Sequence, residues 1–81
     1  YDDSYNANPG SLAAAIETLA LEPGERWLVL GNMAELGPEA AQLHRQSGAL
    51  ARERGIERLW TVGELAAEAA AAFGPGATAC A

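Results

Sequence analysis

The 81-residue sequence contains no lysine, and its five basic residues are all arginines, set against eleven acidic residues. A phosphate-binding loop of the Walker type ends in a lysine, so this chain does not carry one. The formal net charge of −6 argues against nucleic-acid binding, which needs cations to displace counterions from phosphates, and against an anionic membrane surface. We therefore expect no nucleic-acid partner.

Cysteine and histidine occur once each, at Cys80 and His44. A single cysteine excludes a disulfide within the chain and any cysteine-rich metal site, and we expect Cys80 to be a small buried hydrophobic residue. His44 has no cysteine or second histidine with which to share a metal, and we expect it at the surface or boundary of a helix. No stretch approaches the roughly 20 apolar residues of a membrane span. The sequence predicts neither a metal site nor a membrane span.

Large apolar side chains are also scarce, because aromatic residues make up 6% of the chain and 19 positions are alanine. A chain of this length supports one small domain with a thin core. It begins without methionine and stops in what looks like a strand. We therefore expect an excerpt of a longer protein, in contact with other parts of it.

Hydrophobic periodicity predicts an alternation of strands and helices. The strands are expected over residues 1–4, 26–30, 56–62 and 78–80, and the helices over residues 10–22, 38–54 and 64–73. This order with short connections predicts an α/β fold, a Rossmann-like, mostly parallel sheet with flanking helices and right-handed crossovers. The apolar run at residues 26–30 predicts a buried strand covered on both faces. In the second helix the predicted apolar stripe consists of Ala40, Leu43, Ser47, Leu50 and Ala51.

We expect polar side chains to gather at the carboxyl end of the first strand, where Asp2 and Asp3 would stand, and in the turn that follows it. Parallel sheets bind their ligands at the carboxyl ends of their strands. Carboxylates at Asp2 and Asp3 can accept hydrogen bonds from ribose hydroxyls or help to hold hydrated Mg²⁺. Asn6 and Asn8 offer uncharged donors and acceptors, and Tyr5 adds a flat face and a hydroxyl. The same residues also fit a solvated turn with a helix cap, so their spacing alone leaves both interpretations open.

The loop at residues 31–37 follows the second strand. Its glycines are six residues apart, which is not the dinucleotide-binding pattern. Glu35 could bind a cation or an ammonium group, or complement the dipole of the following helix. No serine lies in a nucleophile elbow, and no catalytic residue is predicted.

Two segments carry a resemblance to a known family. Residues 2–9 (DDSYNANP) followed by Ser11, and residues 29–37 (VLGNMAELG), resemble the start of the C-terminal domain of the Mur ligases. They are most similar to the MurF members, which join D-alanyl-D-alanine to UDP-N-acetylmuramoyl-tripeptide in peptidoglycan synthesis. The similarity covers about residues 2–63. Asn32 stands where this family usually has aspartate.

The resemblance implies an ATP-dependent ligase of the bacterial cytoplasm that works through an acyl phosphate, with ATP and Mg²⁺. Residues 1–81 would be the N-terminal portion of the C-terminal domain, a partial domain that is inactive alone. The UDP-substrate domain and the central ATPase domain, with the P-loop and most Mg²⁺ ligands, would lie outside it. The chain would close over ATP and help to form the dipeptide site.

The resemblance also implies roles for single residues. The implied ATP-binding residues are Asp3, Asp2, Tyr5, Asn6 and Asn8, with Asp3 at the ribose. Asn32 and Glu35 would lie near the dipeptide. No residue is implied as catalytic or as a metal ligand.

Two other interpretations remain open from the sequence. One is the corresponding domain of another Mur-type ligase or of a folylpolyglutamate ligase. The other is a non-catalytic α/β interaction module. A P-loop upstream would favour the ligases over the interaction module, and the N-terminal domain would separate the ligases from each other.

Overall fold

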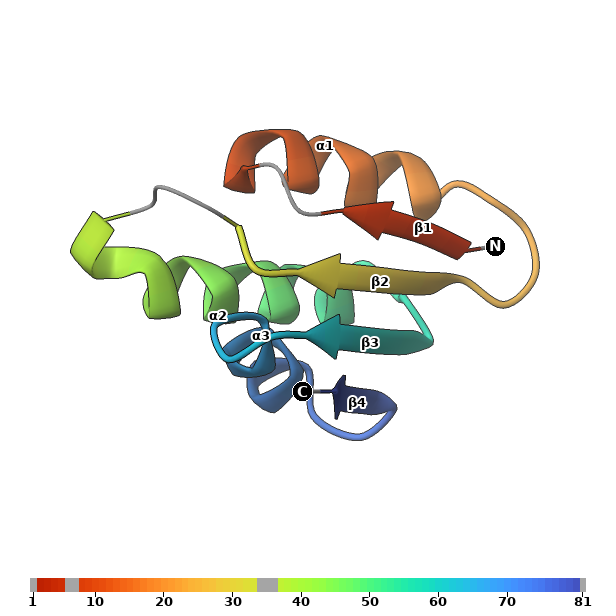
Figure 1. Ribbon diagram of the computed structural model, residues 1–81. Coiled ribbons are helices and arrows are strands. Elements are labelled where there is room, and N and C mark those ends of the chain that lie inside the picture. Colours follow the sequence, from red (N-terminus) through yellow and green to blue (C-terminus); the bar gives the residue numbers. More distant parts are fainter. Residues whose placement is uncertain (1, 6–7, 34–36, 81) are drawn as a thin grey trace.

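The computed structural model describes residues 2–5 as backbone, and residues 8–33 and 37–80 in full. Strands and helices alternate along these residues, as predicted (Figure 1). The strands are β1 (Asp2–Tyr5), β2 (Trp27–Gly31), β3 (Arg58–Val62) and β4 (Ala77–Cys80). The helices are α1 (Pro9–Leu19), α2 (Ala40–Glu53) and α3 (Ala66–Phe73), and the 3-10 turn η1 (Gly37–Glu39) precedes α2.

The four strands form one parallel sheet in the order β1-β2-β3-β4. Tyr5 pairs with Leu30 at the ends of β1 and β2, and Leu30 pairs with Thr61. All strands therefore end at the same edge of the sheet, which we call the carboxyl edge. The predicted α/β class with a parallel sheet is confirmed.

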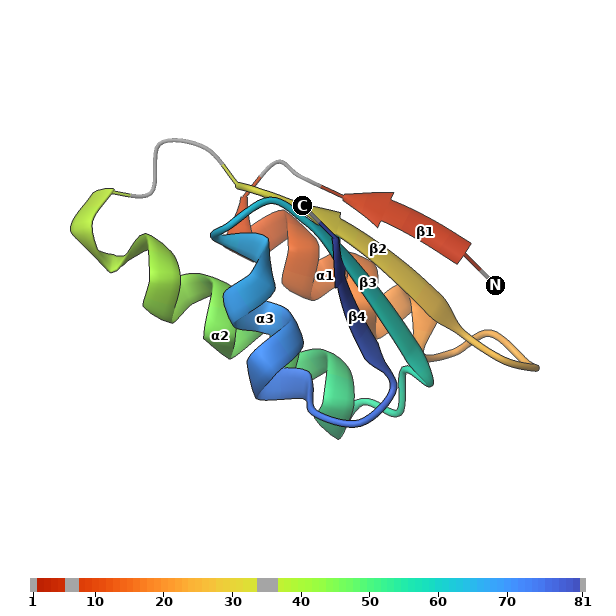
Figure 2. The ribbon, with the colours of Figure 1, turned by 60° about the horizontal axis from the view of Figure 1, so that its bottom comes forward.

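All three helices lie on one face of the sheet (Figure 2). Each connection moves one strand further in the same direction, so crossovers of one hand place every helix on the same side. Burial alternates along β2: Leu28 and Leu30 are 1% exposed, whereas Trp27 is 38% exposed. The prediction that residues 26–30 are covered on both faces is therefore wrong for the described part of the chain.

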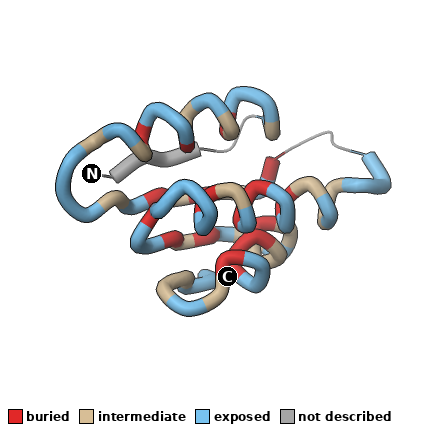
Figure 3. Tube along the Cα trace, turned by 180° about the vertical axis from the view of Figure 1, so that it is seen from behind, coloured by how far each residue is buried: buried red, intermediate tan, exposed pale blue. Residues whose placement is uncertain are grey.

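Apolar side chains between the sheet and the helices form the core. Figure 3 colours the buried residues red along the chain trace, and they occur on both the helices and the strands. Its largest members are Phe73, Leu12, Ile16, Leu28, Leu30, Met33 and Leu59. The alanines of α3 let this helix lie close to α2, and Gly48 of α2 directly faces the backbone of Ala69. Small residues at this contact let the two helix backbones approach closely. Close backbone packing therefore fills space that bulky side chains would otherwise fill.

Helix α1 starts and stops with identifiable partners. The side chain of Asn8 accepts a hydrogen bond from the Ser11 N–H over 2.8 Å, and Pro9 occupies the first helical turn. The helix ends at Leu19, earlier than the predicted residue 22. Leu21 is 85% exposed, so a further helical turn would bury little apolar surface.

Two predictions about single residues are wrong. His44 is 0% exposed and belongs to the buried face of α2 with Ser47, Gly48 and Ala51. This face is rotated from the predicted stripe, because Leu43 and Leu50 are only partly buried. Cys80 is exposed, since β4 is the edge strand of the described sheet and Cys80 ends it.

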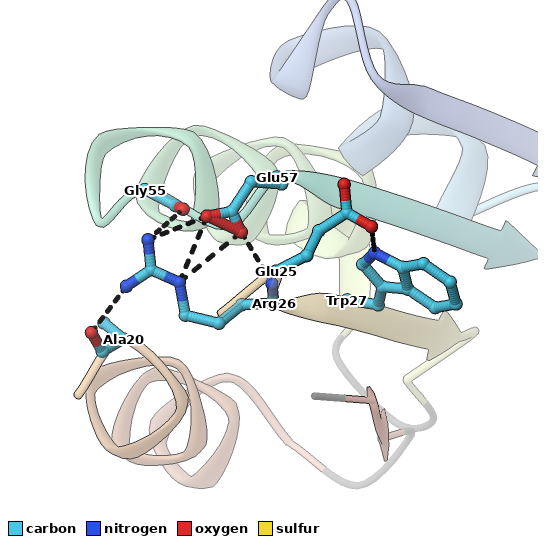
Figure 4. Close-up of polar contacts among 6 residues, drawn as sticks. All are labelled: Ala20, Glu25, Arg26, Trp27, Gly55 and Glu57. Carbon is cyan, nitrogen blue, oxygen red and sulfur yellow. Dashed lines mark hydrogen bonds and ion pairs between the residues drawn. The ribbon is translucent and has the colours of Figure 1, made fainter. Parts of the chain in front are cut away.

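Arg26 joins three segments at the amino-terminal edge of the sheet (Figure 4). Its guanidinium donates to the carbonyl oxygen of Ala20 over 2.7 Å, to that of Gly55 over 2.9 Å, and to Glu57 over 2.8 Å. Ala20 and Gly55 follow α1 and α2, so the cation lies where helix dipoles favour positive charge. The guanidinium and the backbone N–H of Arg26 hold the pKa of Glu57 below its usual value by hydrogen bonding.

We expect this ion pair to make stability depend on pH on the acid side. A carboxyl group whose pKa is lowered by folding stabilises the protein above its unfolded pKa, and this contribution is lost as the pH falls through the lowered value. Glu57→Gln should therefore lose less stability than the unchanged chain between about pH 5 and pH 3. Urea unfolding at several pH values measures this, with Glu22→Gln as the control. Equal acid sensitivity of Glu57→Gln and the unchanged chain would contradict the expectation.

Candidate functional site

The two segments that carry the predicted site residues leave the sheet from neighbouring strands. The register of β1 and β2 ends both strands side by side, with Tyr5 opposite Leu30. The segment leading into α1 and the loop leading into α2 therefore leave the sheet at neighbouring positions. The sequence predicts the ligand at this edge.

Among the predicted ATP-binding residues, the backbones of Asp2, Asp3 and Tyr5 belong to β1. Asp2 and Asp3 are the first two residues of this strand and pair with Trp27 and Leu28, so the prediction that they stand at its carboxyl end is wrong. The strand continues to Tyr5, which is the residue that lies at the carboxyl edge. Asn8 follows the strand, is exposed, and caps α1 through its side-chain oxygen. The capping interpretation of Asn8 is thus confirmed, while its contact with ATP stays a prediction. Asn6 lies outside the described residues.

Asn32 links the loop after β2 to helix α3. Its side-chain oxygen accepts a hydrogen bond from the backbone N–H of Ala66, the first residue of α3, over 2.8 Å. The amide also lies against Gly63, where an added Cβ would come within 2.4 Å of that oxygen. A carboxylate at this position could accept the same hydrogen bond and would also favour the helix N-terminus. Asparagine therefore keeps the hydrogen bond but not the charge.

Sequence reasoning missed the second anchor of this loop, which is His44. The backbone N–H of Met33 donates to Nε2 of His44 over 2.9 Å. Nδ1 of His44 lies 2.7 Å from the carbonyl oxygen of Ala40, one turn earlier in α2. The spacing of His44, Gly48 and Ala51 by four and three residues puts them on one helix face, and this was the available signal. Glu35, the other predicted substrate residue, lies outside the described residues.

A shallow groove of about 250 Å³ lies beside Asn32 at the carboxyl edge. It is lined by Gly63, Glu64, Ala67, Ala79 and Cys80, from the ends of β3 and β4 and the start of α3. Gly63 is shared between the groove and the contact with Asn32. The groove therefore extends the predicted substrate side of the edge away from β1.

The described residues contain neither a metal-binding cluster nor a membrane-spanning helix. Within residues 8–33 and 37–80, no three histidine, cysteine, aspartate or glutamate residues are grouped so that they could hold a metal ion. Nor is any helix in this part of the chain long and apolar enough to cross a membrane.

Residues 1–80 match the family model of the Mur ligase, glutamate ligase domain. The chain is 49% identical over 75 residues to the UDP-N-acetylmuramoyl-tripeptide–D-alanyl-D-alanine ligase of Escherichia coli (strain K12), covering 93% of this chain and 17% of the relative. The ligase of the same name from Bacillus subtilis (strain 168) is 44% identical over 68 residues, covering 82% and 15%. That of Mycobacterium tuberculosis (strain ATCC 25618 / H37Rv) is 46% identical over 68 residues, covering 76% and 13%. The chain thus spans less than a fifth of the length of these relatives.

Proposed function

Because the chain belongs to the Mur ligase family, we propose that it is part of an ATP-dependent ligase that joins D-alanyl-D-alanine to UDP-N-acetylmuramoyl-tripeptide. The observation that carries the proposal is the similarity to ligases of this name, up to 49% identity over 93% of the chain. The shared carboxyl edge of β1 and β2 supports it, because the two segments that resemble the family leave the sheet there from neighbouring strands. Its place would be the bacterial cytoplasm, where ATP and nucleotide-linked precursors occur.

The proposed reaction has two steps. A carboxylate oxygen of the tripeptide attacks the γ-phosphorus of ATP, which forms an acyl phosphate and releases ADP. The amine of D-alanyl-D-alanine then attacks the acyl carbon, the amide bond forms, and phosphate leaves with the loss of one proton. Water competes with the amine at the second step, so the site must close over the intermediate.

This chain would supply the closing side of the site. We propose residues 1–81 as the N-terminal portion of the C-terminal domain, packed against a central ATPase domain that holds most Mg²⁺ ligands. Asp3, with Asp2 beside it, would bind the ribose, and Tyr5, Asn6 and Asn8 would line the nucleotide side. Asn32 and Glu35 would lie on the dipeptide side. Closure then assembles the reactants through proximity and orientation.

Phosphate release by the intact protein tests the function. The assay contains ATP, Mg²⁺ and UDP-N-acetylmuramoyl-tripeptide, with and without D-alanyl-D-alanine. Release that depends on the dipeptide would support the proposal. Release that depends on another amine would assign the chain to a sister ligase, and release with no substrate combination would leave an interaction module.

Asp3→Ala tests the nucleotide side. In the intact ligase we expect the KM for ATP to rise about tenfold, because a carboxylate that accepts hydrogen bonds from the ribose is lost. Steady-state kinetics at saturating tripeptide and dipeptide measure this. Glu22→Ala is the matched control, since it removes a carboxylate from the connection between α1 and β2, outside β1. An unchanged KM for ATP in a folded Asp3→Ala protein would remove Asp3 from the site.

A further inference from the structure

His44 holds the loop after β2 with its unprotonated ring nitrogen. The carbonyl oxygen of Ala40 can only accept, so the hydrogen between it and Nδ1 belongs to the imidazole. The N–H of Met33 donates to Nε2, so this nitrogen carries the lone pair. The structure thus fixes both the neutral state of His44 and its tautomer, with the proton on Nδ1.

Burial leaves the imidazole of His44 as the partner of the Met33 N–H. His44 is 0% exposed and Met33 is 1% exposed, so water cannot replace the imidazole as the partner of the Met33 N–H. A side chain without an acceptor at this position would leave that N–H buried and unpaired, and the loop backbone would have to move to satisfy it. The position of the loop at Met33 therefore depends on one side chain of α2.

A second anchor fixes the residue before Met33. The side chain of Asn32 accepts from the N–H of Ala66, so α3 holds one residue of the loop and α2 holds the next. The two helices touch through backbone where Gly48 meets Ala69, one turn after His44. The loop is thus clamped to a helix pair that cannot shift without losing that contact.

We propose that His44 is a positioning residue for the dipeptide side of the ligase site. It acts through the backbone of Met33 and sets where Asn32 stands at the carboxyl edge, without itself touching substrate. This inference rests on the proposed function, in which Asn32 lies near the dipeptide. It assigns the buried histidine a role in acceptor binding, separate from the nucleotide side on β1.

The kinetic test uses the intact ligase with His44→Leu, His44→Gln and the control Ser47→Ala. We expect His44→Leu to raise the KM for D-alanyl-D-alanine by on the order of tenfold, with less than about a twofold change in the KM for ATP. His44→Gln should recover most of the loss, because its carboxamide oxygen can accept from Met33. Ser47→Ala should change neither constant, since its hydroxyl bonds within its own helix, to the Leu43 carbonyl oxygen.

Two spectroscopic measurements separate positioning from general stability. Long-range ¹H–¹⁵N spectra of the unchanged protein should show His44 protonated at Nδ1 and unprotonated at Nε2, the signals being assigned by their loss in His44→Gln. Amide exchange should show Met33 protected in the unchanged protein and in His44→Gln, and unprotected in His44→Leu. The opposite tautomer would overturn the inference.

The kinetic and exchange measurements together also decide whether His44 positions the dipeptide side. Equal effects of His44→Leu on both KM values, or a normal dipeptide KM with Met33 unprotected, would overturn the positioning role. If His44→Leu does not fold, His44→Gln decides alone. A His44→Gln protein with unprotected Met33 and normal kinetics would overturn the positioning role. A His44→Gln protein with protected Met33 and a normal dipeptide KM would support it. If the unchanged protein shows no dipeptide-dependent phosphate release, the proposed function fails and the link to substrate falls with it. Loss of Met33 protection in His44→Leu would then still support the anchoring of the loop.

Discussion

Replacing Gly48 with alanine is expected to destabilise the chain by roughly 3 kcal/mol, more than its single added methyl group suggests. The new Cβ would lie 2.1 Å from the carbonyl oxygen of Ala69 and within 2.8 Å of its backbone carbons. These atoms belong to the backbone of α3, so no side-chain rotation relieves the clash. Helices α2 and α3 would have to move apart, and the core around Phe73 would open with them.

Gly10→Ala is the matched control for this prediction. Gly10 is also a helical glycine, but an added Cβ there would meet only the side-chain oxygen of Asn8, at 3.5 Å. Alanine has the higher helix propensity, so this variant should keep or slightly raise stability. Urea unfolding followed by far-UV circular dichroism compares the two. Equal unfolding midpoints for both variants would show that α2 and α3 are further apart than described.

The contact between Gly48 and Ala69 also links the packing of the helices to the loop after β2, which we propose lies on the dipeptide side. Helix α2 carries His44, which accepts from the N–H of Met33, and helix α3 donates the N–H of Ala66 to the side chain of Asn32. Separation of the helices at Gly48 would pull these anchors in different directions. The closeness that small residues permit therefore serves the core and also fixes the loop.

The helices and strands could be predicted because capping residues and hydrophobic periodicity indicate the same boundaries. Asn8, Pro9 and Ser11 mark the start of α1, and the short apolar runs of β2 and β3 alternate with helical periodicity. Short connections between parallel strands then leave one class of fold. The family could be predicted from two segments, residues 2–9 and 29–37. Their residues are too specific in type and order to arise from strand or helix preference.

The errors share a cause, which is that they concern tertiary placement. An apolar run such as residues 26–30 has the same composition whether one or both faces are covered, and the strand order decides between them. His44 is buried because its two ring nitrogens find partners on Met33 and Ala40, and a backbone donor 11 residues away leaves no trace in sequence. Cys80 is exposed because β4 is an edge strand of the described sheet, which depends on topology.

The two faces of β2 should respond differently to truncation. Leu28 is 1% exposed and points at the helices, whereas Trp27 is 38% exposed on the uncovered face. Leu28→Ala should destabilise the chain by roughly 2–5 kcal/mol, because it leaves a cavity between the sheet and the helices. Trp27→Ala removes a larger side chain but should cost no more than about 1.5 kcal/mol, mainly its edge-to-face contact with Trp60. Urea unfolding followed by circular dichroism measures both.

Trp60 provides the control for the exposed face. Its ring centroid lies 5.2 Å from that of Trp27, and the planes meet at 70°. If Trp27 contributes mainly through this pair, Trp60→Ala and the double variant should show coupling of about 0.5–1.5 kcal/mol between the two rings. The decisive comparison is made in a chain where Trp60 is already alanine. If Trp27→Ala there lowers stability as much as Leu28→Ala does, this face of the sheet is covered in solution. Size alone would predict the larger loss for tryptophan, so the reversed order tests the one-sided packing that the strand order imposes.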